Sequence, residues 1–101
     1  MKNFKEKVFE LVKKIPKGKV STYSAVAKKL GNKNLARAVG NALNSNENLI
    51  IIPCHRVVKS NREVGGYKLG RKKKIGLLKD EGVEVIGKSG KFFVDLTIFL
   101  D

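Results

Sequence analysis

Apolar side chains recur at helical spacing near the N-terminus of the chain. Asn3 and Glu6 have the spacing of a capping box, which predicts that a helix begins beside them. The turn-forming segment 16–18 (PKG) is expected to end this helix. The apolar residues expected on one helical face are Phe4, Val8, Leu11 and Val12.

Two further helices are predicted on either side of a tight turn. Thr22 is a favourable N-cap for a helix over about residues 23–30, and the segment 31–34 (GNKN) supplies the turn. A third helix is expected over about 35–44. The inward residues are Val26, Ala27 and Leu30, then Leu35, Val39 and Leu43. Two short helices joined by four turn-forming residues are typical of a helix-turn-helix.

The second half of the chain mixes one helix with extended segments. Residues 49–52 (LIII) are expected to form a buried extended segment, and residues 65–67 (GGY) a flexible loop. A fourth helix is predicted over about 71–80, with Gly82 as its C-cap. Its inward residues are Ile75 and Leu78, and the segments 83–86 and 92–100 have strand-like compositions.

These elements predict a mainly α fold of the winged-helix or helix-turn-helix type, with a small β element. At 101 residues the chain has room for one hydrophobic core, and it contains neither repeats nor a low-complexity linker. We therefore expect a single domain over residues 1–101, and a monomer.

The third predicted helix is slim. Ala36, Ala38, Gly40 and Ala42 are small, and Arg37 is its only long basic side chain. Helices that read the major groove usually carry several long polar residues. The small residues are equally consistent with close approach to the DNA minor groove and with tight helix packing inside the protein.

The charge balance points to an acidic partner. Lys and Arg total 22 against 9 for Asp and Glu, which leaves a formal net charge of +13. Such a field attracts polyanions. This charge favours a nucleic acid over a cationic surface that serves only solubility, and acidic membranes come third.

Composition excludes several classes of protein. The longest apolar run, at residues 49–52, is far shorter than the roughly 20 residues that span a bilayer. The N-terminal segment lacks the hydrophobic region of a signal peptide. One cysteine excludes an internal disulfide and suits a reducing compartment, so we expect a cytoplasmic protein, or a nuclear one in a eukaryote.

The only cysteine and the only histidine are neighbours, Cys54 and His55. A cysteine reacts as its thiolate, and a nearby base or cation lowers the thiol pKa from about 8.5. A histidine can accept the thiol proton, directly or through water. No second cysteine or histidine exists to complete a zinc site, so no metal is expected. By itself the pair is weak support for catalysis, because a buried structural cysteine is commoner.

The segment 52–58 (IPCHRVV) resembles the active-site motif of the O6-alkylguanine-DNA alkyltransferases, the direct-reversal DNA repair proteins, also called methylated-DNA–protein-cysteine methyltransferases. Further segments resemble the same family in the same order, over about residues 4–93. They are 16–23 (PKGKVSTY), 36–42 (ARAVGNA), 65–67 (GGY) and 77–82 (LLKDEG). Several motifs in register make the resemblance specific.

The resemblance implies a single-turnover enzyme that moves an alkyl group from O6 of guanine in DNA irreversibly onto Cys54, without a cofactor. His55 would act as a base through a bridging water, and Glu81 would orient His55. Asn46 would support the turn that holds the site. Tyr23 would press on the flanking phosphate and assist protonation of the leaving guanine.

The resemblance also implies double-stranded DNA as the partner, with the alkylated base flipped out of the helix. Arg37 would fill the space that the extruded nucleotide leaves, which favours the minor-groove interpretation of the slim helix. The carbonyls of Cys54 and Val57 would read the guanine amino group. The remaining substrate- or DNA-binding residues implied are Thr22, Ala36, Gly40, Tyr67 and Lys68.

Two features depart from the family pattern. The commoner members carry a further domain before this one, whereas we expect none here. Lys68 stands where the family often has a small residue, and its side chain could crowd the pocket entrance or contact phosphate.

Two other functions compete with alkyl transfer. Alkyltransferase-like proteins of similar length bind the lesion and recruit excision repair without transfer, and typically have Trp or Ala at the cysteine position. A winged-helix transcriptional regulator would explain the charge, yet would leave Cys54, His55 and Glu81 without a role. We therefore favour transfer.

Overall fold

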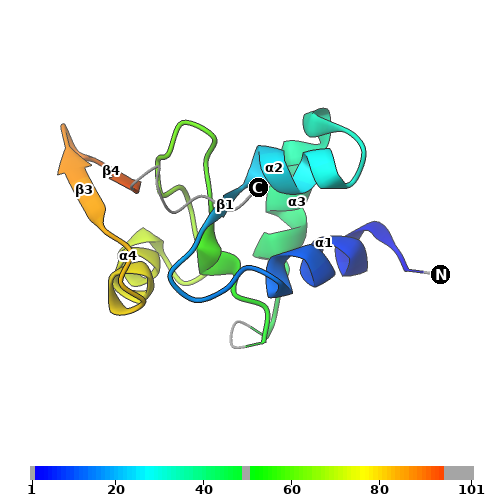
Figure 1. Ribbon diagram of the computed structural model, residues 1–101, viewed down its shortest axis with the longest axis horizontal. Coiled ribbons are helices and arrows are strands. Elements are labelled where there is room, and N and C mark those ends of the chain that lie inside the picture. The colour runs from blue at the N-terminus through cyan, green and yellow to red at the C-terminus, as the bar shows by residue number, and fades with distance from the viewer. Residues whose placement is uncertain (1, 49–50, 95–101) are drawn as a thin grey trace.

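The computed structural model describes residues 2–48 and 51–94 of the chain. Three helices gather on one side of the molecule, and the fourth helix and a β-hairpin lie on the other (Figure 1). The helices are α1 (Phe4–Lys13), α2 (Tyr23–Lys29), α3 (Ala36–Asn44) and α4 (Arg71–Asp80), with 3-10 turns η1 (Lys33–Leu35) and η2 (Cys54–Arg56). The strands are β1 (Ser21–Thr22), β2 (Val57–Val58), β3 (Val85–Lys88) and β4 (Lys91–Val94).

The predicted helix starts are confirmed by their caps. The Asn3 side chain accepts a hydrogen bond from the Glu6 amide at 2.9 Å, and the Thr22 hydroxyl accepts one from the Ala25 amide at 3.0 Å. The predicted third helix is regular only from Ala36, because η1 occupies the residues before it. The mainly α, helix-turn-helix-like architecture with a small β element is as predicted.

A short parallel pairing of β1 with β2 organises the centre of the molecule. Ser21 is in register with Val57, and Thr22 with Val58. Cys54 lies in the turn that leads into β2, and Tyr23 follows β1 directly. The pairing therefore places Tyr23 close to the cysteine turn, although 31 residues separate them in the sequence.

The strand-like C-terminal segments form an antiparallel hairpin. Val85 pairs with Val94 and Lys88 with Lys91, while Ser89 and Gly90 at the tip both have positive φ. Two positive φ values in succession give a turn whose twist matches that of paired strands. Of the predicted segment 92–100, the part beyond Val94 lies outside the described residues.

The prediction of a buried extended segment at 49–52 is wrong where the structure describes it. Ile51 is 57% exposed and lies in a turn, and Ile52 is only half-buried. The cause is local hydrogen bonding, because the Asn48 side chain accepts from the Ile51 amide at 3.2 Å. Asparagine side chains stabilise turns in this way and override the apolar pattern. Residues 49 and 50 lie outside the described part.

Two clusters of buried apolar residues form the core. One joins α1, α2 and α3 to the cysteine turn, and the other joins α4 to the hairpin. The neighbours Val57 and Val58 of β2 belong to different clusters, so β2 lies between them. Among the described residues, no helix has both the length and the apolar character needed to cross a membrane.

On α4 the predicted inward face is only partly correct. Leu78 is fully buried as expected, whereas Ile75 is half-buried. The other fully buried side chain of this helix is a lysine, Lys74, four residues before Leu78 and so on the same face.

Candidate active site

The thiol of Cys54 is buried and fixed by hydrogen bonds from the end of α3. The Asn46 Nδ2 atom lies 3.0 Å from Cys54 Sγ and also donates to the Ile52 carbonyl at 3.1 Å. Cys54 Sγ in turn lies 3.6 Å from the Leu43 carbonyl oxygen. Asn46, itself 2% exposed, thus joins α3 to the cysteine turn, in the position that the resemblance implied.

His55 is buried beside Glu81. The His55 Nε2 atom lies 3.0 Å from Glu81 Oε2, which is an ion-pair distance, although the ring does not align for a well-formed hydrogen bond. Nδ1 has no hydrogen-bond partner among the residues that the structure describes. The structure therefore brings the predicted Cys54, His55, Glu81 and Asn46 together around one turn.

Arg56 fixes the Glu81 carboxylate and was not singled out from the sequence. Its Nε donates to Oε1 at 2.9 Å and its Nη2 donates to Oε2 at 2.6 Å, a two-pronged contact. Its Nη1 donates to the Ile15 carbonyl at 2.8 Å, between α1 and β1. Its place directly after His55 was the only sequence signal for this role.

Burial dominates the acid–base state of the site. Burial raises the pKa of the Cys54 thiol and outweighs the Asn46 hydrogen bond and the charges of Lys74 and Lys68, which lower it. Nearby groups thus lower this thiol pKa as expected, but burial has the larger effect and the net pKa is raised. Burial lowers the pKa of His55 despite the opposing effect of Glu81, so the imidazole is kept neutral.

The Glu81 carboxylate remains ionised. Burial raises its pKa, but the hydrogen bonds from Arg56 and the close approach of His55 outweigh this, and the net pKa is lowered. A neutral imidazole beside an ionised carboxylate is the arrangement in which a histidine can accept a proton.

Lys74 brings a buried amino group to the same site. Its Nζ donates to the Val57 carbonyl at 2.7 Å and to the Gly66 carbonyl at 3.1 Å, and lies 3.5 Å from the Tyr23 hydroxyl oxygen. Burial lowers the pKa of Lys74 to about 7. Its side chain holds the loop containing Gly66 against β2. Only its helical spacing from Leu78 could have indicated its burial.

A small pocket of about 30 Å³ opens at the thiol. This volume is about one water molecule's share of liquid water, far less than a purine requires. The His55 and Tyr67 rings meet edge to face nearby, with centroids 6.5 Å apart. The residues that line the pocket are Tyr23, Gly40, Leu43, Asn44, Cys54, Gly66 and Tyr67.

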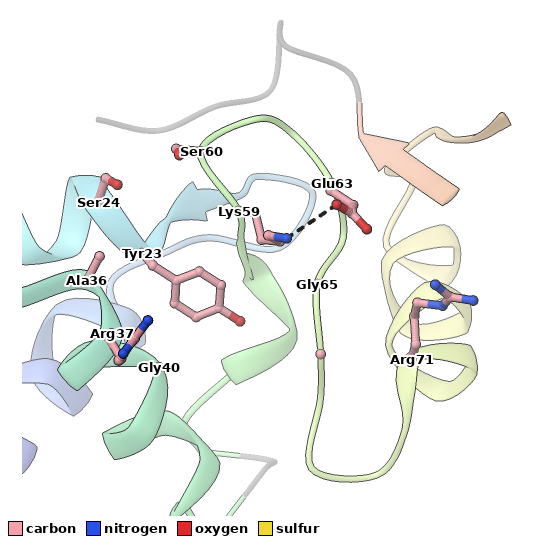
Figure 2. A pocket seen from close by; sticks show the side chains of 11 residues that line it. Tyr23, Ser24, Ala36, Arg37, Gly40, Lys59, Ser60, Glu63, Gly65 and Arg71 are labelled. Carbon is pink, nitrogen blue, oxygen red and sulfur yellow. Dashed lines mark hydrogen bonds and ion pairs between the residues drawn. The ribbon is translucent and has the colours of Figure 1, made fainter. Parts of the chain in front are cut away.

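A much larger groove of about 780 Å³ runs beside the pocket. Figure 2 shows Tyr23 between α3 and the loop that carries Gly65, with Arg71 across the groove on α4. Exposed Arg37 lines the groove together with Ala36 and Gly40. The other predicted DNA- or substrate-binding residues do not line the groove. The Thr22 hydroxyl caps α2, Tyr67 lines the small pocket, and Val57 and Lys68 line neither.

Lys68 extends from the loop before α4 toward the end of α3. Its Nζ donates to the Asn46 carbonyl at 2.9 Å. No group of three or more His, Cys, Asp or Glu side chains suited to a metal ion occurs in the described part of the chain.

Comparison with known proteins gives a consistent result. The family model for the DNA-binding domain of 6-O-methylguanine DNA methyltransferase matches residues 3–83. A methylated-DNA–protein-cysteine methyltransferase of Saccharolobus islandicus is 51% identical over 82 residues, which are 81% of this chain and 52% of that protein. One of Candida glabrata is 41% identical over 98 residues, 97% of this chain and 47% of that protein. The chain thus spans about half the length of these curated relatives.

Solved structures include proteins similar to the whole chain. S. pombe Atl1, crystallised with damaged DNA containing O6-carboxymethylguanine, is 31% identical with a TM-score of 0.88, over 100% of this chain and 99% of that one. The O6-methylguanine-DNA methyltransferase of Pyrococcus kodakaraensis is 40% identical with a TM-score of 0.73, over 82% of this chain and 48% of that one.

Proposed function

The chain belongs to the 6-O-methylguanine DNA methyltransferase family through its DNA-binding domain, and from this premise we propose that it repairs alkylated DNA by direct reversal. The alkyl group moves from O6 of guanine to Cys54, once per protein molecule. The observation that carries this proposal is the thiol held by Asn46 next to a neutral His55 and an ionised Glu81.

The transfer is a substitution at the alkyl carbon. Cys54 Sγ forms a bond to that carbon while the bond between the carbon and guanine O6 breaks, and its electron pair goes to the guanine. The thiol proton passes to His55, for which Nδ1 is suited because it has no partner in the described part of the chain. The guanine takes up one proton, so the products are the thioether and unmodified guanine. A thioether has no good leaving group, which makes the reaction irreversible.

Two groups near the pocket suit protonation of the leaving guanine. The Tyr23 hydroxyl lines the pocket, and burial raises its pKa, so it retains its proton. Lys74 Nζ lies 3.5 Å from that hydroxyl oxygen. A lysine with a pKa of about 7 can exchange protons near neutrality, and Tyr23 remains the group that faces the pocket.

DNA binding is assigned to the large groove. Arg37 projects from a helix slim enough for the minor groove, and the net charge of +13 supplies affinity for DNA of any sequence. A pocket of about 30 Å³ does not hold a guanine, so the pocket has to widen when the flipped base enters.

The test is stoichiometry. Duplex DNA containing one O6-methylguanine is titrated with the protein, and restored guanine is measured by a restriction enzyme that the lesion blocks. We expect one lesion repaired per molecule and no turnover. Lesions that remain after saturating protein would contradict the proposal.

A second candidate is lesion binding without transfer. The similarity to S. pombe Atl1, which was crystallised with damaged DNA containing O6-carboxymethylguanine, favours this candidate. The same titration separates the candidates, since a lesion-binding protein protects the DNA but leaves the lesion in place.

A further inference from the structure

Lys68 places a second positive charge beside the reactive thiol. Its Nζ donates to the backbone carbonyl of Asn46 at 2.9 Å, and the side chain of the same Asn46 lies 3.0 Å from Cys54 Sγ. Lys68 therefore reaches from the loop after Tyr67 to the residue that holds the thiol. The positive charge of Lys68 lowers the pKa of the Cys54 thiol, although burial raises that pKa by more.

Lys68 differs from Lys74, the other lysine close to Cys54. Lys74 is fully buried and its Nζ is bound by two carbonyl oxygens. Lys68 is exposed and its Nζ donates to a neutral carbonyl, and no carboxylate lies within ion-pair distance of it among residues 2–48 and 51–94. Its ammonium is thus available to an anion that arrives at the thiol.

The geometry of alkyl transfer decides which anion that is. Sγ attacks the first carbon of the adduct, so any group on that carbon is brought to within a few ångströms of the thiol. A negatively charged adduct repels an incoming thiolate, and a cation beside both charges offsets the repulsion.

We propose that Lys68 makes this protein selective for O6-guanine adducts that end in a carboxylate, such as carboxymethyl. This inference rests on the proposed function and names the substrate class that the site prefers. The charge of Lys68 offsets the repulsion between the adduct carboxylate and the sulfur, and Lys68 exchanges the Asn46 carbonyl for the carboxylate.

The experiment compares two adducts of nearly equal size. Duplexes carry O6-carboxymethylguanine or its neutral amide, O6-carbamoylmethylguanine, and both the dissociation constant and the rate of transfer to Cys54 are measured. We expect the wild-type protein to prefer the charged adduct. Lys68→Met, which keeps the length but removes the charge, should reduce the preference about fivefold, as for a partly screened ion pair.

Lys72→Met is the matched control, because Lys72 is an exposed lysine on α4 that lines neither the groove nor the small pocket. It should leave the ratio between the two adducts unchanged. An equal ratio for wild type and Lys68→Met would overturn the inference. So would an equal loss with both adducts, which would assign Lys68 to a DNA phosphate.

O6-methylguanine duplex, tested in parallel, separates this inference from the proposed function. Methyl transfer with an unchanged adduct ratio refutes only the role of Lys68. If no adduct is transferred, the proposed function fails, and the ratio of dissociation constants decides the role of Lys68 in recognition.

Discussion

The groove and the pocket are neighbours with opposite character. The groove measures about 780 Å³ and exposes Arg37, whereas the pocket measures about 30 Å³ and encloses a thiol held by protein hydrogen bonds. Tyr23, Gly40 and Gly66 line both, so the groove and the pocket adjoin. Under the proposed function, the groove supplies affinity for DNA through side chains free to meet phosphates, and the pocket supplies reactivity through side chains that the protein has already oriented.

The Cys54→Ala substitution is expected to distinguish the roles of the pocket and the groove most strongly. The change removes the nucleophile from the pocket and leaves the groove intact, so transfer should be abolished while the dissociation constant for O6-methylguanine duplex changes less than about threefold. The fraction of lesions that remain in the DNA and the dissociation constant are measured on the same samples. A parallel loss of binding would show that the pocket and the groove are not separable.

Arg37→Ala is the converse experiment, because it changes the groove and leaves the pocket intact. We expect transfer in duplex DNA to slow by about 10- to 100-fold, because base extrusion costs a few kcal/mol that the arginine helps to offset. A single-stranded oligonucleotide with the same lesion needs no extrusion and should lose much less. Lys88→Ala, an exposed cation on the hairpin, is the control. Equal losses on both substrates would remove Arg37 from base flipping.

Glu81→Gln should slow transfer by about tenfold on single-stranded and duplex DNA alike. Burial lowers the pKa of His55 and Glu81 opposes that effect. Without the carboxylate the pKa of His55 falls further, which weakens it as a base. The rate of transfer by the wild-type protein should fall only below pH 6.5. In Glu81→Gln the same fall in rate should occur at still lower pH.

Glu84→Gln, three residues later and exposed, is the matched control for this change. Glu81→Gln should also cost about 1–3 kcal/mol of unfolding free energy, because Arg56 loses an ionised partner. If the rate falls at the same acidic pH in Glu81→Gln and in the wild type, this carboxylate does not act through His55.

Lys74→Met is expected to change the pH dependence of stability. The folded-state pKa of Lys74 is about 7, below the ordinary lysine value of 10.5, so between these values the unfolded chain binds more protons than the folded one. The contribution of Lys74 to stability therefore rises with pH across that window, by at most about 1.4 kcal/mol per pH unit, and is constant below it.

Lys74→Met removes this dependence, whereas Lys72→Met keeps it. Chemical denaturation of the two variants and wild type at several pH values between 6 and 9 measures the difference. The variant also loses the hydrogen bonds to Val57 and Gly66, which lowers its stability at every pH. Parallel curves for Lys74→Met and wild type would show that Lys74 is charged in the folded protein.

Much of the fold and of the site could be predicted from the sequence. Capping residues and helical spacing predicted the four helices, and the resemblance to the alkyltransferases implied that Asn46, His55 and Glu81 gather at Cys54. Local patterns of this kind are written into short segments, which is why they can be recognised without coordinates.

What the sequence could not predict depends on tertiary packing. Lys74 stands in a run of one arginine and three lysines at residues 71–74, and only the docking of α4 shows which of these cations is buried. Arg56 finds its Ile15 partner 41 residues away through the β1–β2 pairing. The exposure of Ile51 follows from an asparagine turn that competes with its apolar character. The raised pKa of Cys54 likewise follows from burial, which outweighs the nearby cations.

The most direct test of the central claim is the intact mass of the protein after incubation with duplex DNA containing one O6-methylguanine, followed by peptide mapping. A gain of one methyl group confined to Cys54 is the predicted result. Tight binding to the same DNA without any change in mass would contradict it and would assign the pocket to lesion recognition alone.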